Sequence, residues 1–235
     1  MFEWFLRLFN REVEISNPVT CLATGLRGRL YLGMGDHIEI YLEGGKTGHW
    51  ESLGENSLIT SIAVSAERIY LADAGSRVIW KFNQDGRLLG RIGEKNPEKQ
   101  IQGFIIPSPY FDVGIDPDGR LWAANTGRHL LEQYNDSGDL VRSWGEYSMK
   151  IDGFCGCCNP SHFSFLPDGS FVTSEKGIPR VKIYSAEGVL KAVVAASEQF
   201  EEGTVGLDLA VSGRGHIYVL DPHQKAVRIF EKKSN

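Results

Sequence analysis

The sequence contains no long hydrophobic run, no long run of basic residues and almost no helical periodicity beyond its first residues. A helix that spans a membrane needs about 20 consecutive apolar residues, so no such helix is expected. The net charge is −5, from 25 basic and 30 acidic residues, and this balance does not favour binding to nucleic acid. At 235 residues the chain is long enough to bury the core of one domain.

Cysteine is also scarce, and its distribution excludes a conventional disulfide framework. The four cysteines are Cys21, Cys155, Cys157 and Cys158, so three of them lie within four residues. A framework of bridges links distant segments, which this spacing does not allow. Free cysteines favour a reducing, cytosolic setting over an exported one, or else a bound metal.

Short strand-like runs separated by turns are what the chain does contain. Residues 110–145 hold four of them, at 111–115, 121–124, 130–134 and 140–144. The first two are joined by Pro117-Asp118-Gly119, in which Pro presets φ and Gly accepts a positive φ. A single unit of four antiparallel strands is too small to bury its own faces, so it must stack on copies of itself.

Copies of this unit occur at residues 19–53, 59–93, 162–195 and 207–231, the last with only three strands. The centres of the second strands recur at intervals of roughly 40–50 residues, as repeat architectures require; they are Tyr31, Tyr70, Trp122, Val172 and Tyr218. The last repeat lacks a fourth strand, whereas residues 11–15 form a strand pattern that belongs to no repeat. We therefore predict an all-β protein, a β-propeller of five four-stranded blades whose ring is closed by residues 11–15. A six-bladed or incomplete ring is the alternative.

The repeat pattern resembles NHL repeats. It consists of a hydrophobic strand, an Asp-Gly turn, a strand like Ile-Tyr-Val, an Asp/Asn-x-Gly loop and a final Val-x-x-Tyr/Phe strand, and it covers nearly the whole chain after about residue 17. The segment GFCGCCNP, followed by LPDGSFVTSEKGIPRVKIY, is similar to a group of bacterial NHL proteins. The resemblance implies a propeller, usually with six blades, that serves as a binding scaffold, a lyase or a hydrolase.

The first ten residues form a separate amphipathic segment, and residues 11–235 are expected to form a single propeller domain. Phe2, Phe5, Leu6 and Phe9 fall on one face at helical spacing. Such a segment either contacts a membrane surface or plugs one end of the propeller. The plug is favoured, because the segment carries a single basic residue.

The two ends of the predicted blades differ in their loops. Short Asp-Gly and Ser-Gly turns gather at one end and are expected to be structural. The long crossovers between blades, residues 94–109, 146–161 and 197–206, gather at the other end, which we call the crossover side. Long loops on a rigid scaffold are the usual place for binding, so we expect a protein or small-molecule ligand there.

Aligning the first strands of the repeats predicts a ring of polar residues on the crossover side. The small residues Ala23, Ala63, Gly114, Ser164 and Ala210 are predicted to be equivalent. Two positions earlier stand Cys21, Ser61, Asp112, His162 and Asp208, which share one face. Asp112 and Asp208 are therefore candidate binding residues, or else they only hydrate the channel.

The crossover GFCGCCNP runs directly into this ring at His162, which predicts a cluster of Cys155, Cys157, Cys158 and His162. Thiolate and imidazole suit Zn or Cu(I), so a metal site is one reading. A disulfide between the neighbours Cys157 and Cys158, or plain buried thiols, are the others. A metal site would favour a metal-dependent enzyme of lyase or hydrolase type, and a Cys157–Cys158 disulfide would favour a thiol redox protein. These two functions are the alternatives to a binding scaffold.

Basic residues follow the second strands and add positive charge to the same side; they include Arg77, Arg128, His129, Lys176 and Arg180. A basic cluster over an acidic protein predicts an anionic ligand or partner. Where a loop also holds an aspartate, as with Asp73 and Arg77, we expect a salt bridge within the loop. Arg128 and His129 have no acid in their loop and are therefore the better binding candidates, together with Arg180.

Overall fold

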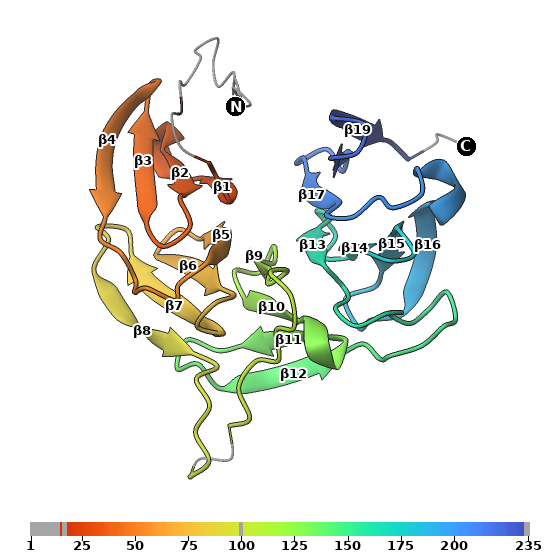
Figure 1. The fold of residues 1–235 in the computed structure, drawn as a ribbon, viewed down its shortest axis with the longest axis horizontal. Helices are drawn as coiled ribbons and strands as arrows, with labels where there is room; N and C mark the ends of the chain where they lie inside the picture. The colour runs from red at the N-terminus through yellow and green to blue at the C-terminus, as the bar shows by residue number, and fades with distance from the viewer. Residues whose placement is uncertain (1–14, 16–17, 99–100, 233–235) are drawn as a thin grey trace. The chain divides into compact units, whose positions relative to one another are not determined.

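The computed structural model describes Ile15 and residues 18–98 and 101–232. The chain divides into two compact units, Met1–Gly103 and Phe104–Asn235, and each is described by itself. The fold is all-β, with five antiparallel sheets that form the blades of a β-propeller, as the repeats predicted (Figure 1).

The first unit holds two four-stranded blades. The first blade is built from β1 (Cys21–Thr24), β2 (Leu30–Gly33), β3 (Ile38–Leu42) and β4 (Gly45–Trp50), with the short 3₁₀ helix η1 (Leu26–Gly28) between β1 and β2. The second blade is built from β5 (Ile59–Val64), β6 (Arg68–Asp73), β7 (Val78–Asn83) and β8 (Leu88–Ile92). The first strands β1 and β5 lie next to each other, and a core that includes Tyr31, Ile62 and Trp80 packs between the two sheets.

The second unit holds three blades. The third blade is built from β9 (Val113–Ile115), β10 (Leu121–Asn125), β11 (Leu130–Tyr134) and β12 (Leu140–Trp144), with the 3₁₀ helix η2 (Thr126–Arg128) between β10 and β11. The fourth blade is built from β13 (His162–Phe165), β14 (Phe171–Glu175), β15 (Arg180–Tyr184) and β16 (Leu190–Ala195), and the 3₁₀ helix η3 (Ser197–Gln199) follows it. The fifth blade is built from β17 (Asp208–Val211), β18 (Ile217–Asp221) and β19 (Ala226–Phe230). The first strand β13 lies between β9 and β17. The last sheet has three strands, in the order β17-β18-β19.

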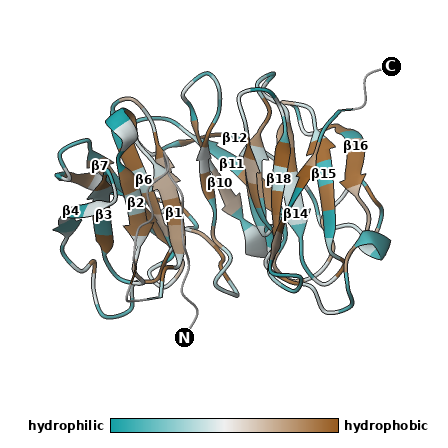
Figure 2. Ribbon diagram, turned by 90° about the horizontal axis from the view of Figure 1, so that it is seen from above, coloured by the Kyte–Doolittle hydropathy of each residue, from teal (hydrophilic) through white to brown (hydrophobic). Residues whose placement is uncertain are grey.

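Hydrophobic residues concentrate in the strands and hydrophilic ones in the loops (Figure 2). In the second unit, aromatic contacts join neighbouring blades: Trp122 of β10 meets Phe171 of β14 edge-on, with ring centroids 4.8 Å apart. Trp144 of β12 contacts both Phe171 and Tyr184, with centroid separations of 4.9 Å to each. Such rings contribute large buried areas, so the blades are held together by their apolar faces.

The strand register predicted from the repeats is confirmed in all five blades. Each small residue of a first strand pairs with the predicted centre of the second strand; the pairs are Ala23–Tyr31, Ala63–Tyr70, Gly114–Trp122, Ser164–Val172 and Ala210–Tyr218. The turn before β10 is also as predicted, since the Gly119 N–H donates to the Asp116 carbonyl at 2.9 Å and Gly119 has φ +81°.

The predicted closing strand, residues 11–15, lies outside the described residues except for Ile15. Ile15 packs against a cluster of Leu30, Leu32 and Tyr41 in the first unit. Closure of the ring by residues 11–15 stays a prediction, as does the amphipathic segment 1–10, which also lies outside the described residues. No helix in the described part of the chain is long and apolar enough to cross a membrane.

Candidate functional site

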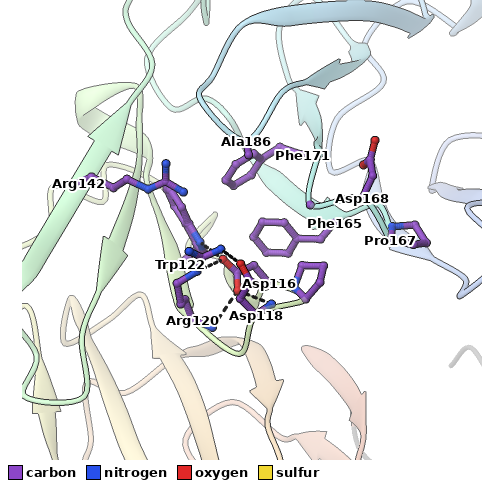
Figure 3. A pocket seen from close by; sticks show the side chains of 12 residues that line it. Asp116, Asp118, Arg120, Trp122, Arg142, Phe165, Pro167, Asp168, Phe171 and Ala186 are labelled. Carbon is purple, nitrogen blue, oxygen red and sulfur yellow. Dashed lines mark hydrogen bonds and ion pairs between the residues drawn. The ribbon is translucent and has the colours of Figure 1, made fainter.

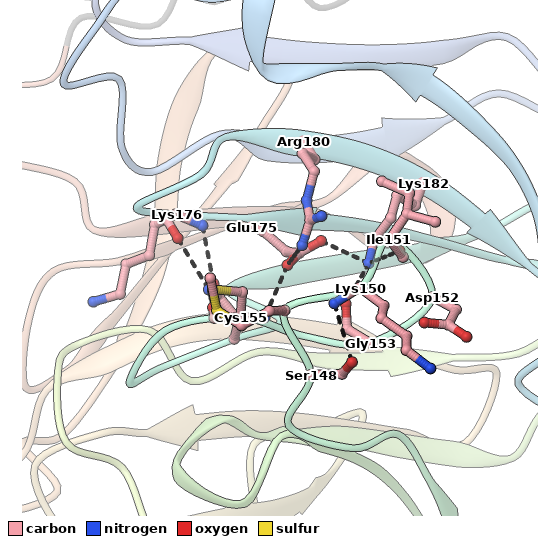
Figure 4. Close-up of polar contacts among 12 residues, drawn as sticks. Ser148, Lys150, Ile151, Asp152, Gly153, Cys155, Glu175, Lys176, Arg180 and Lys182 are labelled. Carbon is pink, nitrogen blue, oxygen red and sulfur yellow. Dashed lines mark hydrogen bonds and ion pairs between the residues drawn. The ribbon is translucent and has the colours of Figure 1, made fainter.

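A cluster of buried charges supports the crossover that carries three cysteines (Figure 4). Glu175 ends β14 with a side chain that is 0% exposed, and it pairs with Arg180 at 2.6 Å and with Lys182 at 2.7 Å. Both cations come from β15, the next strand of the same blade. Buried charges are tolerated in a protein only when they are paired, and each charge of this cluster has a partner of opposite sign within 2.7 Å.

The buried cluster also holds the crossover in place. Lys182 Nζ donates to the carbonyl oxygens of Ile151, at 3.0 Å, and Gly153, at 2.8 Å. The Cys155 N–H donates to Glu175 Oε2 at 3.3 Å. Burial lowers the pKa of Lys182, although the negative charge of Glu175 opposes that shift. Arg180, predicted as a binding residue, is therefore engaged in supporting this loop.

Asn159 fixes the end of the same crossover. Its side chain is fully buried; Oδ1 accepts the Lys176 N–H at 2.9 Å, while Nδ2 donates to the carbonyls of Lys176, at 3.0 Å, and Cys155. The backbone oxygen of Asn159 lies 3.3 Å from Nδ1 of His129. The crossover, the loop after β14 and the loop after β10 are thus joined at one residue.

Two neighbouring thiols lie on this crossover. Cys157 is exposed and Cys158 is buried, and their Sγ atoms share a hydrogen bond at 3.1 Å. Burial opposes ionisation of Cys158, but hydrogen bonds from Ser108 and Cys157 and the positive charge of Lys176 together lower the pKa of its thiol. The pKa of Cys157 is raised by its hydrogen bond to Cys158 and by the charge of that neighbour. Of the two thiols, Cys158 is therefore the more acidic.

Lys176 is the cation beside this thiol pair. Its Nζ donates to Ser108 Oγ at 3.0 Å and lies 4.5 Å from the centroid of the Tyr110 ring. Tyr110 in turn packs edge-on against His162, with ring centroids 5.6 Å apart. No carboxylate in the described ranges forms an ion pair with Lys176, because Glu175, the acid next to it in the chain, is occupied by Arg180 and Lys182. We call Ser108, Tyr110, Cys157, Cys158, His162 and Lys176 the thiol–lysine site.

The predicted four-residue metal site is not assembled. Within residues 18–98 and 101–232, no three His, Cys, Asp or Glu side chains gather closely enough to hold a metal ion. Cys155 turns away from the pair, with its Sγ 3.2 Å from Sδ of Met149. Cys158 lies beside the Lys176 ammonium, whose positive charge would repel a metal cation.

Of the two aspartates predicted to flank the site, Asp112 is structural. It is buried, and its Oδ2 accepts the Phe163 N–H of β13 at 2.8 Å, so that it joins two blades. Its Oδ1 accepts the Val113 N–H at 2.9 Å. Asp208 occupies the equivalent position as the first residue of β17, where it is exposed and its Oδ1 accepts the Leu209 N–H at 2.7 Å.

Arg128 and His129, the other predicted binding residues, lie at the edge of the same crossover. Both are half-buried, and His129 adopts a left-handed conformation with φ +61° at the end of η2. The His129 ring packs against Tyr147 with centroids 5.2 Å apart. Through Asn159 these residues are linked to the loop of Lys176, so they remain candidates on the border of the thiol–lysine site.

Three blades share an anchor that the sequence analysis missed. In each, a polar residue at the end of the second strand accepts a hydrogen bond from the crossover that precedes the blade. Asn125 Oδ1 accepts the Ile105 N–H at 3.0 Å, as Glu175 accepts that of Cys155. In the first unit, Asp73 accepts the Leu58 N–H at 2.9 Å. The signal was present, since a polar residue closes an apolar strand at the same place in each of these repeats.

Asp73 also shows why the salt bridge predicted within its loop is wrong. The carboxylate is fully buried and, besides Leu58, it accepts hydrogen bonds from four more donors, at 2.6–3.1 Å; they are Ser57 Oγ, Gly75 N, Ser76 N and Trp80 Nε1. Arg77 instead contributes its backbone N–H, which donates to the Asp73 carbonyl at 2.8 Å. Burial raises the pKa of Asp73, but the hydrogen bonds outweigh it and lower the pKa overall.

The turn side of the second unit has a cavity of about 200 Å³ (Figure 3). Its polar lining is satisfied internally: Asp116 Oδ2 accepts bonds from Trp122 Nε1, at 3.0 Å, and Arg120 Nε, at 2.8 Å, while Arg120 also pairs with Asp118. Arg142 stacks on Trp122 at 4.8 Å and donates to Gln133 at 2.7 Å. These groups brace the turns, so the thiol–lysine site is the better candidate.

Comparison with known proteins defines the class to which this fold belongs. The structure is similar to a streptogramin B lyase structure, with 13% identity over 95% of this chain and 73% of that one and a TM-score of 0.64. It is also similar to the WD40 β-propeller domain of Doa1 (17% identity, 92% and 64% covered, TM-score 0.61) and to a protein of unknown function from Bacteroides thetaiotaomicron (14% identity, 93% and 60% covered, TM-score 0.68).

These similarities show a β-propeller fold and, at such identities, the fold alone. The chain spans 60–73% of the length of those three structures. No protein-family model matches the sequence, and no curated protein does. The NHL repeats and the bacterial origin therefore stay predictions from the sequence pattern.

Proposed function

We propose that the protein is a binding scaffold whose thiol–lysine site takes up a ligand carrying a carboxylate or phosphate group. The observation that carries the proposal is the Lys176 ammonium, which is held by Ser108 and Tyr110 but has no carboxylate partner among the described residues. A half-buried ammonium without a carboxylate partner attracts anions more strongly than one in open water, because the local dielectric is lower.

The surroundings of Lys176 fit such a ligand. Arg128 and His129 lie at the border of the site and add positive charge or hydrogen-bond donors. The crossover itself is anchored by Glu175, Lys182 and Asn159, so the site is prepared before the ligand arrives. A prepared site loses less conformational entropy on binding than a mobile one. The similarity to propellers that include a WD40 domain agrees with a scaffold role.

The proposal predicts that the thiol pair prefers an anionic alkylating reagent over a neutral one. Iodoacetate and iodoacetamide differ by one charge, so the ratio of their alkylation rates at Cys157 measures attraction of anions to the site. We expect the iodoacetate-to-iodoacetamide rate ratio at Cys157 to be about tenfold higher than the same ratio for N-acetylcysteine. This factor is equivalent to roughly 1.4 kcal/mol of attraction. Lys176→Met should remove this preference, and inorganic phosphate should slow the reaction with iodoacetate.

Lys191→Met is the control, since Lys191 belongs to the same blade but is exposed and lies on the turn side, 3.9 Å from Asp168. It should leave the ratio unchanged. A wild-type ratio equal to that of N-acetylcysteine, or the same loss in both variants, would contradict the proposal. Rates are read by mass spectrometry of the peptide that contains Cys157.

A further inference from the structure

We propose that Cys157 and Cys158 form a thiol–disulfide exchange site for small disulfides that carry carboxylates. The inference rests on the proposed function, because it assigns the anionic ligand of that site to a chemical class. Its own basis is the division of labour between the two thiols: one is exposed and the other is buried at 3.1 Å from it.

The exposed sulfur is the one that an incoming disulfide reaches. Cys157 releases its proton to solvent, and its thiolate attacks one sulfur of the small disulfide, whose S–S bond breaks; one small thiolate leaves and takes up a proton from solvent, and a mixed disulfide forms on Cys157. Thiol–disulfide exchange proceeds through such intermediates. The Lys176 ammonium, held by Ser108 Oγ at 3.0 Å, lies beside the pair to attract the carboxylates and to stabilise the leaving thiolate.

The buried sulfur completes the reaction. Cys158 loses its proton and attacks Cys157 Sγ, the mixed disulfide breaks, the second small thiolate leaves and takes up that proton, and a Cys157–Cys158 disulfide remains. Two protein thiols are oxidised and one small disulfide is reduced to two thiols, so no other oxidant is required. Cys158 is suited to this step because it is already within hydrogen-bond distance of Cys157 and is shielded from other reactants.

The product is expected to be reduced easily. Consecutive Cα atoms are about 3.8 Å apart, which is shorter than the roughly 4.4–6.8 Å that most disulfides span. A bridge between neighbours is therefore strained, and strained, exposed disulfides are the labile ones. Excess small thiol should reverse the reaction, so that the pair exchanges electrons with its ligand in both directions.

The remaining cysteines do not compete for this role. Cys155 packs its sulfur against Met149 at 3.2 Å, and Cys21 lies in the other unit, on β1. Cys155→Ser and Cys21→Ser are therefore matched controls, which remove a thiol without removing the pair.

The test is to incubate the reduced, full-length protein with oxidised glutathione, which is anionic, or with hydroxyethyl disulfide, which is neutral. After free thiols are blocked with N-ethylmaleimide, intact mass and peptide mapping identify the products. With oxidised glutathione we expect loss of two hydrogen atoms and a bridge at Cys157–Cys158, formed at least about tenfold faster than with the neutral reagent. Cys158→Ser should accumulate the mixed disulfide at Cys157, whereas both control variants should react as the wild type does.

The wild-type protein alone decides the outcome, so a variant that fails to fold does not obscure it. A mixed disulfide that persists on Cys157, a bridge that involves Cys155 or Cys21, or no reaction would overturn the exchange site while leaving anion binding intact. A Cys157–Cys158 bridge that forms equally fast with both reagents would overturn the anionic class of substrate and, with it, the proposed function.

Discussion

Replacing Glu175 with alanine is expected to lower the free energy of unfolding by about 3–5 kcal/mol, the usual result of breaking a buried ion pair. The substitution leaves the Lys182 ammonium and the Arg180 guanidinium buried without their carboxylate. It also removes the acceptor of the Cys155 N–H, which helps to hold the crossover. Denaturant unfolding followed by fluorescence measures the change.

Asp168→Asn is the matched control for Glu175→Ala. Asp168 also pairs with a lysine in the second unit, but its partner Lys191 lies 3.9 Å away and both side chains are about half-exposed or more. Exposed pairs of this kind contribute about 0–1 kcal/mol, so the control should barely move the unfolding curve. Equal effects of the two substitutions would show that the buried cluster does not support the fold.

Replacing Asp73 with asparagine is expected to destabilise the first unit by at least about 2 kcal/mol. The Asp73 carboxylate accepts hydrogen bonds from five donors, and asparagine would replace one of its two oxygens with an NH₂ group, which cannot accept them. The effect should depend on pH. The pKa of Asp73 is lowered in the folded protein, so its contribution is complete above the pKa of the unfolded chain, about 3.9. It is lost as the pH falls from there through the folded pKa.

The measurement is the difference in unfolding free energy between the wild type and Asp73→Asn at a series of pH values. It should be constant near neutrality and shrink below the unfolded pKa. Asp85→Asn provides a control in the same unit, on the exposed turn before β8, and should stay within about 0.5 kcal/mol at all pH values. A difference that grows as the pH falls would contradict the assigned sign.

The fold was predictable from the sequence because strand register is a local, repeated property. Apolar residues at every second position and turns such as Asp118-Gly119 recur in each repeat, so equivalent positions can be aligned without coordinates. The pairing of Gly114 with Trp122 and of Ser164 with Val172 followed directly. The first strand of the third repeat begins later than the predicted residue 111, because β9 starts at Val113. The Val113 N–H donates to the Asp112 carboxylate at this point.

The site was only partly predictable, because partners of charged residues are chosen in space. Glu175 precedes Lys176 in the chain, and a salt bridge within that loop is one arrangement that the sequence allows. In the structure Glu175 turns into the blade, where Arg180 and Lys182 approach it from the next strand, and Lys176 keeps its charge. No spacing in the sequence distinguishes these two outcomes.

The cysteines illustrate the same limit. Their crossover was correctly placed beside the start of β13, yet the sequence left metal, disulfide and structural readings open. Cys155 and Cys158 point to different partners, Met149 and the Ser108–Lys176 pair, because Asn159 and Lys182 fix the crossover between them. Those anchors depend on the fold of the whole blade rather than on the GFCGCCNP segment alone.

The pH profile of the reaction between the thiol pair and iodoacetamide tests the central claim most directly, since that claim is the placement of the Lys176 ammonium beside the thiol pair. The hydrogen bond to Cys158 raises the pKa of the exposed Cys157, and the positive charge of Lys176 opposes that shift. The same charge helps to lower the pKa of Cys158. We expect the wild-type rate to rise at a lower pH than the rate of Lys176→Met, and Lys191→Met to follow the wild type. Identical profiles for the wild type and Lys176→Met would contradict it.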